Sequence, residues 1–365
     1  GWRSSPARHG TEDGDPGHRW SDTVDRGGDW GFESASRAIM DSLRRRLLTG
    51  LVLGFIVVLG LALFSDIRQV GSHLAAFSWH LTPLILAGTL FNYSLRFIKW
   101  HFYLGQIGAQ NLSLLKSAQL FVAGFPLAVT PGKVGEAMKG VWLNRETGIP
   151  VARGVTVVLA ERISDGLAVL LLSTLGVVAY RRYWPAFAIV LTLLIAGIIL
   201  SQIRPIALWA LDTAERLPLL KRVSPHLREF YEGTYTLFRP RSTLIAVGLG
   251  TIAWLGEGIA MYLVLLGLGV PAGWHTFSIA VFTLSFSTVI GAVSTLPGGL
   301  GAVEVSMTGM LILLLGLPTS TATAATLIIR FATLWFGVAL GLVTWLFSKD
   351  LLLLESNQPE PAEAA

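Results

Sequence analysis

The chain has 365 residues, of which 52% are hydrophobic and 14% charged, with a mean hydropathy of +0.60, no cysteine and a net charge of +5. Soluble domains carry about a quarter charged residues, so this composition excludes an ordinary soluble protein, and the absence of cysteine excludes disulfides, thiolate metal sites and a cysteine nucleophile. Most basic residues lie beside apolar segments, which indicates membrane topology and gives no reason to expect a nucleic-acid partner.

The two ends of the chain differ from the rest. Residues 1–40 are rich in Gly, Asp, Ser and Arg and show little apolar periodicity, so we expect a disordered cytoplasmic arm. This segment has no apolar region ahead of a cleavage site, unlike a signal peptide. Residues 351–365 are expected to form a second disordered tail. The transmembrane domain is therefore predicted to cover residues 41–350.

Six apolar segments come close to the length of full membrane spans, which need about 20 residues each. They cover residues 47–64, 81–102, 155–180, 186–203, 244–266 and 322–347. Between the fourth and fifth, residues 205–241 are rich in Arg and Lys. Within this stretch, Ser224-Pro225 begins an amphipathic segment, which is typical of a cytoplasmic helix at the membrane interface.

Two further apolar stretches are interrupted by Pro-Gly. Residues 115–143 are broken at Pro131-Gly132 into two parts too short to span the membrane, which favours a re-entrant hairpin. Residues 277–315 are broken at Pro297-Gly298, and these parts are long enough either to cross or to re-enter. We therefore predict an all-α, polytopic integral membrane protein with about six full spans and two broken or re-entrant helix hairpins.

Basic residues set the predicted orientation. Arg44–Arg46 precede the first span, and the predicted cytoplasmic loops hold most of the other Lys and Arg residues. The predicted outside loops hold only Arg68, Arg181 and Arg182. The positive-inside rule then places both termini in the cytoplasm, in a multi-pass protein of the cell (inner) membrane.

The two broken stretches belong to an internal repeat. Each copy has a Pro-Gly break, then a Gly-X-Pro turn, and then an Arg twelve residues after that proline. These landmarks are Pro131, Gly132, Gly148, Pro150 and Arg162 in repeat A (about residues 81–180), and Pro297, Gly298, Gly316, Pro318 and Arg330 in repeat B (about residues 244–347). An odd number of full spans separates the hairpins, which predicts inverted repeats whose Pro-Gly tips meet near the membrane midplane.

The Pro-Gly breaks themselves indicate a binding site. At membrane depth, freed backbone groups are tolerated only when they are buried in protein or line a cavity, and the N-terminus of the half-helix after a break can hold an anion. The hairpin backbone residues expected to form this site are Pro131, Gly132, Gly135, Pro297, Gly298, Gly299 and Gly301.

Ionisable residues inside apolar segments are candidate functional residues, because each costs about 2.5–3.5 kcal/mol at the membrane centre on insertion scales. The candidates for substrate binding are Arg96, Lys133, Glu136, Glu161, Arg162, Asp165, Glu257, Glu304 and Arg330. Six of them are expected to converge on one central cavity: Lys133, Glu136, Arg162, Asp165, Glu304 and Arg330. Glu136 and Glu304 should each lie within salt-bridge reach of a basic group, because an unpaired carboxylate there would take up a proton.

Structural roles stay open for several of these residues. Glu161, Arg162 and Asp165 lie within about one helical turn and can form structural ion pairs instead. Glu257 fits a helix-packing hydrogen bond as well as a ligand contact. Lys99 and Lys139 are expected to extend their charged ends to the cytoplasmic interface.

Other motifs are missing from the sequence. There is no GxxxxGK[ST] motif, no HExxH motif and no histidine spacing suited to a metal, so we expect neither an ATPase, nor a metal, nor a cofactor. Gly337 and Gly341 form a GxxxG motif, which we interpret as helix packing within the bundle.

Three motifs, TPGKVGEAMKGVWL, LAERISDG and STLPGGLGAVE, resemble those of the lysylphosphatidylglycerol synthase transmembrane-region family, also called flippase-like domain proteins. The resemblance covers about residues 47–347. The matching motif positions are Pro131, Gly132, Gly135, Glu136, Glu161, Arg162, Asp165, Pro297, Gly298, Gly299, Gly301 and Glu304.

The resemblance implies a lipid substrate. In bifunctional members of that family this region moves an aminoacylated phospholipid to the outer leaflet, and a soluble domain makes that lipid. The present sequence contains no such domain, so the resemblance implies a separate lipid-synthesising enzyme as a partner. Stand-alone relatives are linked to glycolipids, polyprenyl-linked sugars and hopanoids, which leaves the lipid open, as it leaves the oligomeric state.

We therefore expect a lipid flippase without its own ATPase, and not an enzyme. Lys133, Arg162 and Arg330 would hold a phosphate, and the carboxylates would hold a cationic or hydroxylated head group or exchange protons. One alternative is a membrane-embedded enzyme that acts on a lipid head group, with Glu161 or Asp165 as general base. Another is a secondary transporter of a small anion. A groove open sideways to lipid favours a flippase, whereas a closed central pocket favours a small solute.

Overall fold

The computed structural model describes residues 66–177, 184–205 and 224–348, together with isolated positions between 49 and 60 and between 207 and 213. The predicted arm (residues 1–40), most of the predicted first span (residues 47–64) and the predicted tail (residues 351–365) lie outside the described residues.

Every regular element in the described part of the chain is a helix. Five helical segments are long and apolar enough to cross a membrane: Trp79–Gln106, Pro240–Gly267, Trp274–Val293, Pro297–Leu315 and Thr319–Phe347. The helix α6 (Val151–Val177) also has the length of a span, but it carries three ionisable residues in its middle. The chain is therefore a polytopic α-helical membrane protein, as the hydropathy pattern predicts.

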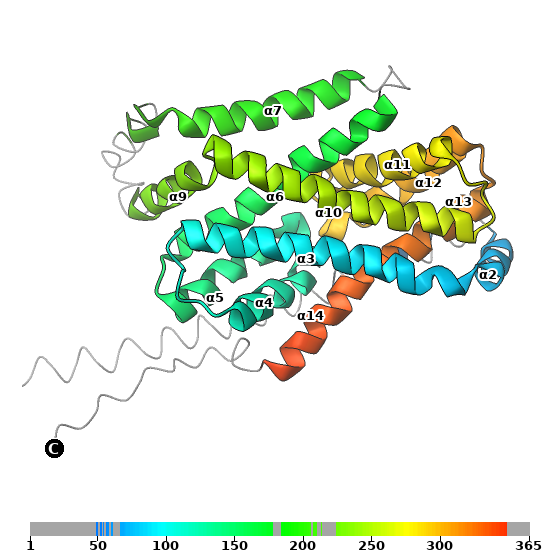
Figure 1. The fold of residues 1–365 in the computed structure, drawn as a ribbon, viewed down its shortest axis with the longest axis horizontal. Coiled ribbons are helices and arrows are strands. Elements are labelled where there is room, and N and C mark those ends of the chain that lie inside the picture. The colour runs from blue at the N-terminus through cyan, green and yellow to red at the C-terminus, as the bar shows by residue number, and fades with distance from the viewer. Residues whose placement is uncertain are drawn as a thin grey trace, which may run out of the picture.

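Two long helices, α3 (Thr82–Gln106) and α10 (Pro240–Gly267), lie side by side along the long axis of the molecule (Figure 1). They approach closely because glycines face each other: a Cβ on Gly88 would lie 2.8 Å from the carbonyl oxygen of Gly256. Small residues at helix crossings allow this contact in membranes, where packing drives helix association. Helix α6 packs against α10 and contacts α3.

Hairpin A is the first broken stretch. It consists of α4 (Leu114–Ala123), the 3₁₀ segments η3 (Phe125–Val129) and η4 (Pro131–Ala137), and α5 (Met138–Thr147). The chain turns where predicted, because Thr130 is extended and Gly132 takes a φ of 60°, which only glycine adopts readily.

Hairpin B is the second broken stretch, formed by α11 (Trp274–Val293), η6 (Pro297–Gly299) and α12 (Ala302–Leu315). Gly298 has a φ of 59°, close to that of Gly132. The two tips touch, since the backbone N–H of Gly132 donates to the carbonyl oxygen of Thr295 at 2.9 Å. The expectation that the Pro-Gly tips meet is confirmed; their depth in a membrane stays a prediction.

The repeat is visible in the local structure that follows each hairpin. Gly148 ends α5 and Gly316 ends α12, each in the left-handed conformation with φ of 72° and 64°. A new helix then starts directly after each proline: α6 in repeat A and α13 (Thr319–Arg330) in repeat B. The same sequence landmarks therefore produce the same turns and helix starts in both copies.

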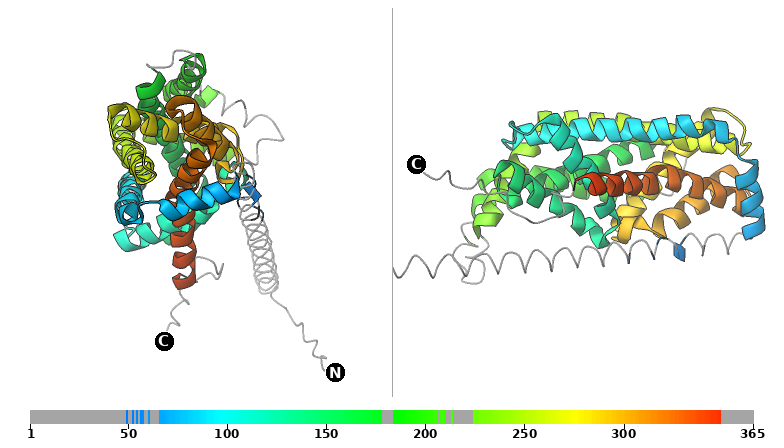
Figure 2. Two further views of the ribbon diagram at one scale, coloured as in Figure 1. Left: turned by 90° about the vertical axis from the view of Figure 1, so that its right-hand side faces the viewer. Right: turned by 90° about the horizontal axis from the view of Figure 1, so that it is seen from below.

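The two hairpins lie toward opposite ends of the long axis (Figures 1 and 2). Hairpin A lies toward the end that holds α9 (Ser224–Leu237), and hairpin B toward the end that holds α2 (Ile67–Ala76). This arrangement is what inverted repeats require, although the two-fold relation itself stays a prediction. Helix α9 begins at Ser224, as predicted.

Two features differ from the expected elements. The predicted last span is divided into α13, a π-helical segment η7 (Phe331–Trp335) and α14 (Phe336–Phe347). Helix α2 has no counterpart among the predicted elements, because its ten residues are too few and too polar for a membrane span. The fourth predicted span is α7 (Trp184–Gln202).

Candidate functional site

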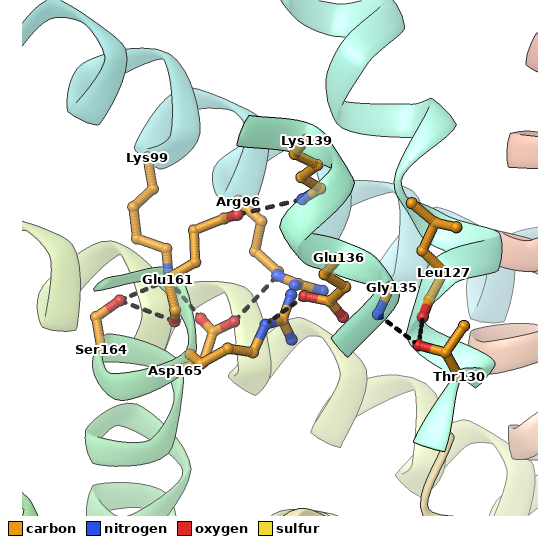
Figure 3. A network of polar contacts seen from close by, with 11 residues as sticks. Arg96, Lys99, Leu127, Thr130, Gly135, Glu136, Lys139, Glu161, Ser164 and Asp165 are labelled. Atoms are coloured by element: carbon orange, nitrogen blue, oxygen red, sulfur yellow. Dashed lines mark hydrogen bonds and ion pairs between the residues drawn. The ribbon is translucent and has the colours of Figure 1, made fainter. Parts of the chain in front are cut away.

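Buried charged side chains gather beside the tip of hairpin A (Figure 3). They come from α3, from η4 and α5, and from α6. We call the following seven residues cluster A: Arg96, Lys99, Glu136, Lys139, Glu161, Arg162 and Asp165.

Asp165 joins α6 to α3. Its carboxylate accepts from the Nζ of Lys99 and lies 3.2 Å from the Nε of Arg96. Lys99 Nζ also donates to the hydroxyl of Ser164 at 3.1 Å. The expectation that Lys99 reaches the interface is wrong: its side chain is completely buried, because a carboxylate and a hydroxyl on α6 offer it partners in the protein interior.

Lys139 and Glu161 form a second buried pair, with 3.2 Å between Nζ and Oε2. The Nζ of Lys139 lies 4.9 Å from the ring centre of Trp100 and 5.1 Å from that of Phe121, so aromatic faces add to the carboxylate contact. A Cβ on Gly124 would lie 2.2 Å from the Cε of Lys139, so glycine makes room for this stem. The expectation that Lys139 reaches the interface is therefore also wrong.

Glu136 and Arg162 connect the hairpin tip to α6. Their Oε2 and Nε atoms are 2.9 Å apart, which confirms the expected partner for Glu136. The Arg162 side chain is 28% exposed, whereas that of Glu136 is 2% exposed. Arg162 is thus more accessible than Arg96, Lys99 or Lys139, and it is the cation of cluster A best placed to meet a ligand.

Glu304 on hairpin B forms an ion pair with Arg330 at the end of α13, and we call these two residues pair B. The Nε of Arg330 lies 2.5 Å from the Oε1 of Glu304, and its Nη2 donates to the carbonyl of Gly298 at 3.0 Å. The other carboxylate oxygen of Glu304 accepts from the backbone N–H of Gly301 at 2.6 Å and so caps α12. The expected partner of Glu304 is confirmed.

Pair B repeats the Glu136–Arg162 pair at an equal separation along the sequence. Glu304 and Arg330 are 26 residues apart, as are Glu136 and Arg162 (162 − 136 = 26). In both cases a Glu behind the Pro-Gly turn binds an Arg on the next helix. The two copies therefore keep the same charged contact as well as the same turns.

Glu257 is buried on α10, the helix that packs against both α6 and α13. Its carboxylate lies in the electric field of Arg96 and Asp165 of cluster A and of Arg330 of pair B. Of the predicted site residues, the structure thus brings Arg96, Glu136, Glu161, Arg162 and Asp165 into one cluster and Glu304 and Arg330 into a second group. The side chain of Lys133 lies outside the described residues, and a single cavity that unites these residues stays a prediction.

The hairpin glycines allow close backbone approach. Gly299 and Gly301 have φ of 67° and 86°, which a residue with a side chain adopts only under strain. A Cβ on Gly135 would lie 2.8 Å from the Oγ1 of Thr130, and that oxygen accepts the N–H of Gly135 at 2.9 Å. Pro131 and Pro297 begin the short helical segments at the two tips.

An apolar groove of about 720 Å³ is lined in part by residues that precede and follow Arg330 in the chain. It is bounded by α2, the N-terminal part of α3, the end of α13, η7 and the first residue of α14, and Phe331 and Ala332 of η7 directly follow Arg330. Three of its lining side chains, Ile67, Trp79 and Phe331, are more than half exposed, so the groove opens on the surface of the molecule. Sequence reasoning missed this groove, because α2 and the π-helical segment form it together.

Several known proteins are similar to this chain. Residues 51–341 match the family described as Lysylphosphatidylglycerol synthase TM region. A UPF0104 membrane protein of Methanothermobacter thermautotrophicus is 25% identical over 83% of this chain and 93% of its own length. Another from Pyrococcus horikoshii is 25% identical over 71% of this chain and 84% of its own length. No solved structure matches the chain.

Proposed function

Because the chain belongs to the lysylphosphatidylglycerol synthase transmembrane-region family, we propose that it is a lipid flippase that moves an amphiphilic lipid between leaflets without its own ATPase. One observation carries this proposal: neighbouring residues of one helix take part in a charged pair and in an apolar groove. Arg330 belongs to pair B, and the next residue, Phe331, lines the groove. An amphiphile needs both environments side by side, whereas a small anion needs only the charges.

The charges of the site balance among the side chains that the structure describes. The cations Arg96, Lys99, Lys139, Arg162 and Arg330 stand against the anions Glu136, Glu161, Asp165, Glu257 and Glu304. A lipid phosphate that binds Arg162 or Arg330 therefore replaces a carboxylate as the partner of that arginine. The released carboxylate is then available to a cationic or hydroxylated head group, or to a proton. The planar guanidinium suits such an exchange because it binds carboxylate and phosphate with the same geometry.

The tips of the two hairpins form the path of the head group in this proposal. They touch each other, and their helices lie toward opposite ends of the molecule, so each Glu–Arg pair would serve one side of the membrane. Lys133, next to Gly132 at the tip of hairpin A, would add a further cation for the phosphate. The acyl chains would remain in the apolar groove and the surrounding bilayer.

This proposal involves no chemical step on the lipid. The enzyme alternative would use Glu161 or Asp165 as its general base. Both carboxylates are buried, and each is paired with a lysine. We place the protein as a multi-pass protein in the cell (inner) membrane with both termini in the cytoplasm. A separate enzyme would make the lipid.

The test is leaflet exchange in liposomes that contain the purified protein. Fluorescent head-group lipids of zwitterionic, anionic and aminoacylated classes are placed in both leaflets, and an impermeant quencher reports how fast inner lipid becomes accessible. We expect exchange of at least one class above that of protein-free liposomes, and loss of this exchange in Arg330→Gln. The exposed Arg241, at the start of α10, gives the matched control Arg241→Gln, which should exchange lipid like the parent.

Three results would overturn the proposal. If no lipid class exchanges faster than in protein-free liposomes, the protein is not a flippase. Uptake of inorganic phosphate without lipid exchange supports the small-anion transporter. A lipid with a chemically altered head group, seen by mass spectrometry, supports the enzyme. Mass spectrometry of lipids that co-purify with the protein would identify the class to test first.

A further inference from the structure

The side chain of Tyr93 on α3 enters the helix that follows Arg330. Its hydroxyl donates to the carbonyl oxygen of Thr333 at 2.7 Å. In an uninterrupted α-helix the carbonyl of Thr333 would accept from the backbone N–H four residues later, that of Gly337. Here the carbonyl of Thr333 accepts from the hydroxyl of Tyr93 and from the backbone N–H of Phe336, three residues later.

The π-helical segment η7 occurs at this position. The N–H of Phe336 donates to the carbonyl of Phe331, five residues earlier, which is the bond of a π-helix. A side chain inserted into the hydrogen-bond ladder is a known physical cause of such a local opening. Helix α6, the counterpart in repeat A, is α-helical throughout Val151–Val177. The opening is therefore specific to the helix that carries Arg330.

Gly337 makes the insertion of Tyr93 sterically feasible. A Cβ at this position would lie 2.5 Å from the hydroxyl oxygen of Tyr93, well inside normal contact distance. Gly341, the partner of Gly337 in the GxxxG motif, packs on hairpin A, where its Cβ would lie 2.2 Å from the Cδ of Pro126. The GxxxG motif thus serves packing within this chain, as predicted.

The π-helical segment lies between two differently anchored halves of one helix. Before it, Arg330 binds Glu304 and the carbonyl of Gly298 on hairpin B. After it, α14 packs against hairpin A, where the indole N–H of Trp345 donates to the carbonyl of Ala123 at 2.8 Å. The ring of Tyr93 also contacts hairpin A, with its centre 4.7 Å from that of Phe125.

We propose that Tyr93 is a positioning residue, whose hydroxyl holds the π-helical segment open and thereby sets the orientation of Arg330 toward Glu304. Segment η7 is then the hinge through which hairpin A and hairpin B act on each other. This inference goes beyond the proposed function, since it assigns to Tyr93 a contact with the helix backbone and not with the lipid. It rests on the proposed function only where lipid exchange is the readout.

The first experiment measures geometry and needs no transport. The chain has no cysteine, so Leu313→Cys on α12 and Phe347→Cys on α14, both highly exposed, can carry two spin labels. We expect a narrow distance distribution in the parent and a shifted or broader one after Tyr93→Phe, which removes only the hydroxyl. Tyr262→Phe is the matched control, because the hydroxyl of Tyr262 accepts from Gly273 in a distant loop, and it should leave the distances unchanged.

The second experiment tests the contact with Gly337. Gly337→Ala should disturb the same distance, because its Cβ forces the hydroxyl out. The double variant Tyr93→Phe/Gly337→Ala should be no worse than the single variants, since the two changes remove one contact. Additive effects, or an unchanged distance distribution in Tyr93→Phe, overturn the proposal.

A third experiment measures lipid exchange and tests whether the hinge affects transport. Tyr93→Phe should slow exchange about five- to tenfold, the size expected for the loss of a buried hydrogen bond, and Tyr262→Phe should not. If the parent moves no lipid, the proposed function fails while the distance measurement still decides the role of Tyr93. If the distances shift but exchange keeps the parent rate, the hinge does not control transport and that part of the proposal is wrong.

Discussion

The side chain of Lys99 on α3 is completely buried, and its ammonium group donates a hydrogen bond to the carboxylate of Asp165 on α6. The pair ties together two of the longest helices in the described part of the chain, beside the contact between the tip of hairpin A and Arg162. A charge removed from water in this way is stable only with its partner present. The pair therefore supports the frame on which the more accessible Arg162 is held.

The first prediction concerns this frame. Asp165→Asn should lower the free energy of unfolding by about 3–5 kcal/mol, because it leaves the buried charge of Lys99 without a carboxylate. Thermal unfolding of the purified protein in detergent measures the effect. The double variant Lys99→Met/Asp165→Asn should be less damaging than the sum of the two single changes. Strictly additive losses would show that the two residues stabilise the fold independently.

The second prediction concerns Arg162. If this residue binds a lipid phosphate, Arg162→Ala should slow lipid exchange about 10- to 100-fold, as expected for the loss of a charge-assisted hydrogen bond, while the protein still inserts and folds. Arg162→Lys should restore exchange only in part, because lysine lacks the planar fork that matches phosphate. Size-exclusion chromatography and thermal unfolding serve as controls. Failure of Arg162→Ala to fold would assign Arg162 a structural role with Glu136.

The third prediction concerns the hairpin tips. Gly132→Val and Gly298→Val should each slow exchange, because both glycines have a φ near 60°, where a β-branched residue is strained by about 1–2 kcal/mol. Gly309→Val on α12 is the control, since a Cβ there meets nothing within 4 Å. Liposome exchange rates at equal protein content give the comparison. Parent rates in both tip variants would make the hairpins packing elements only.

The fourth prediction concerns inverted topology. In a chain without cysteine, Arg145→Cys at the end of hairpin A and Thr319→Cys at the start of α13 are exposed single labelling sites. An impermeant maleimide should label Thr319→Cys in intact cells but Arg145→Cys only after the membrane is opened. Labelling of both from the same side rules out inverted repeats. An experimental structure should then superpose Pro131 on Pro297 and Arg162 on Arg330 by a two-fold rotation.

Much of the architecture follows from local sequence patterns. Hydropathy places the helices because each apolar segment must satisfy its own backbone in a membrane, whatever its neighbours. Pro131-Gly132 and Pro297-Gly298 place the breaks, since proline removes a backbone donor and glycine tolerates positive φ. The equal spacing of landmarks in the two copies identifies the repeat, and with it the pairs of Glu136 and Glu304 with an arginine.

Only the tertiary structure decided which helices supply the remaining partners. Lys99 and Lys139 look like interfacial lysines in sequence, because nothing near them in the chain shows that Asp165 and Glu161 of another helix face them. The π-helical segment after Arg330 contains Thr333, whose carbonyl accepts from the hydroxyl of Tyr93, 240 residues away in the chain. The groove likewise needs α2 to lie against α13, a contact between elements far apart in sequence. Periodicity and turn residues report what the backbone does locally, whereas partners for buried charges and hydroxyls are set by how the helices pack.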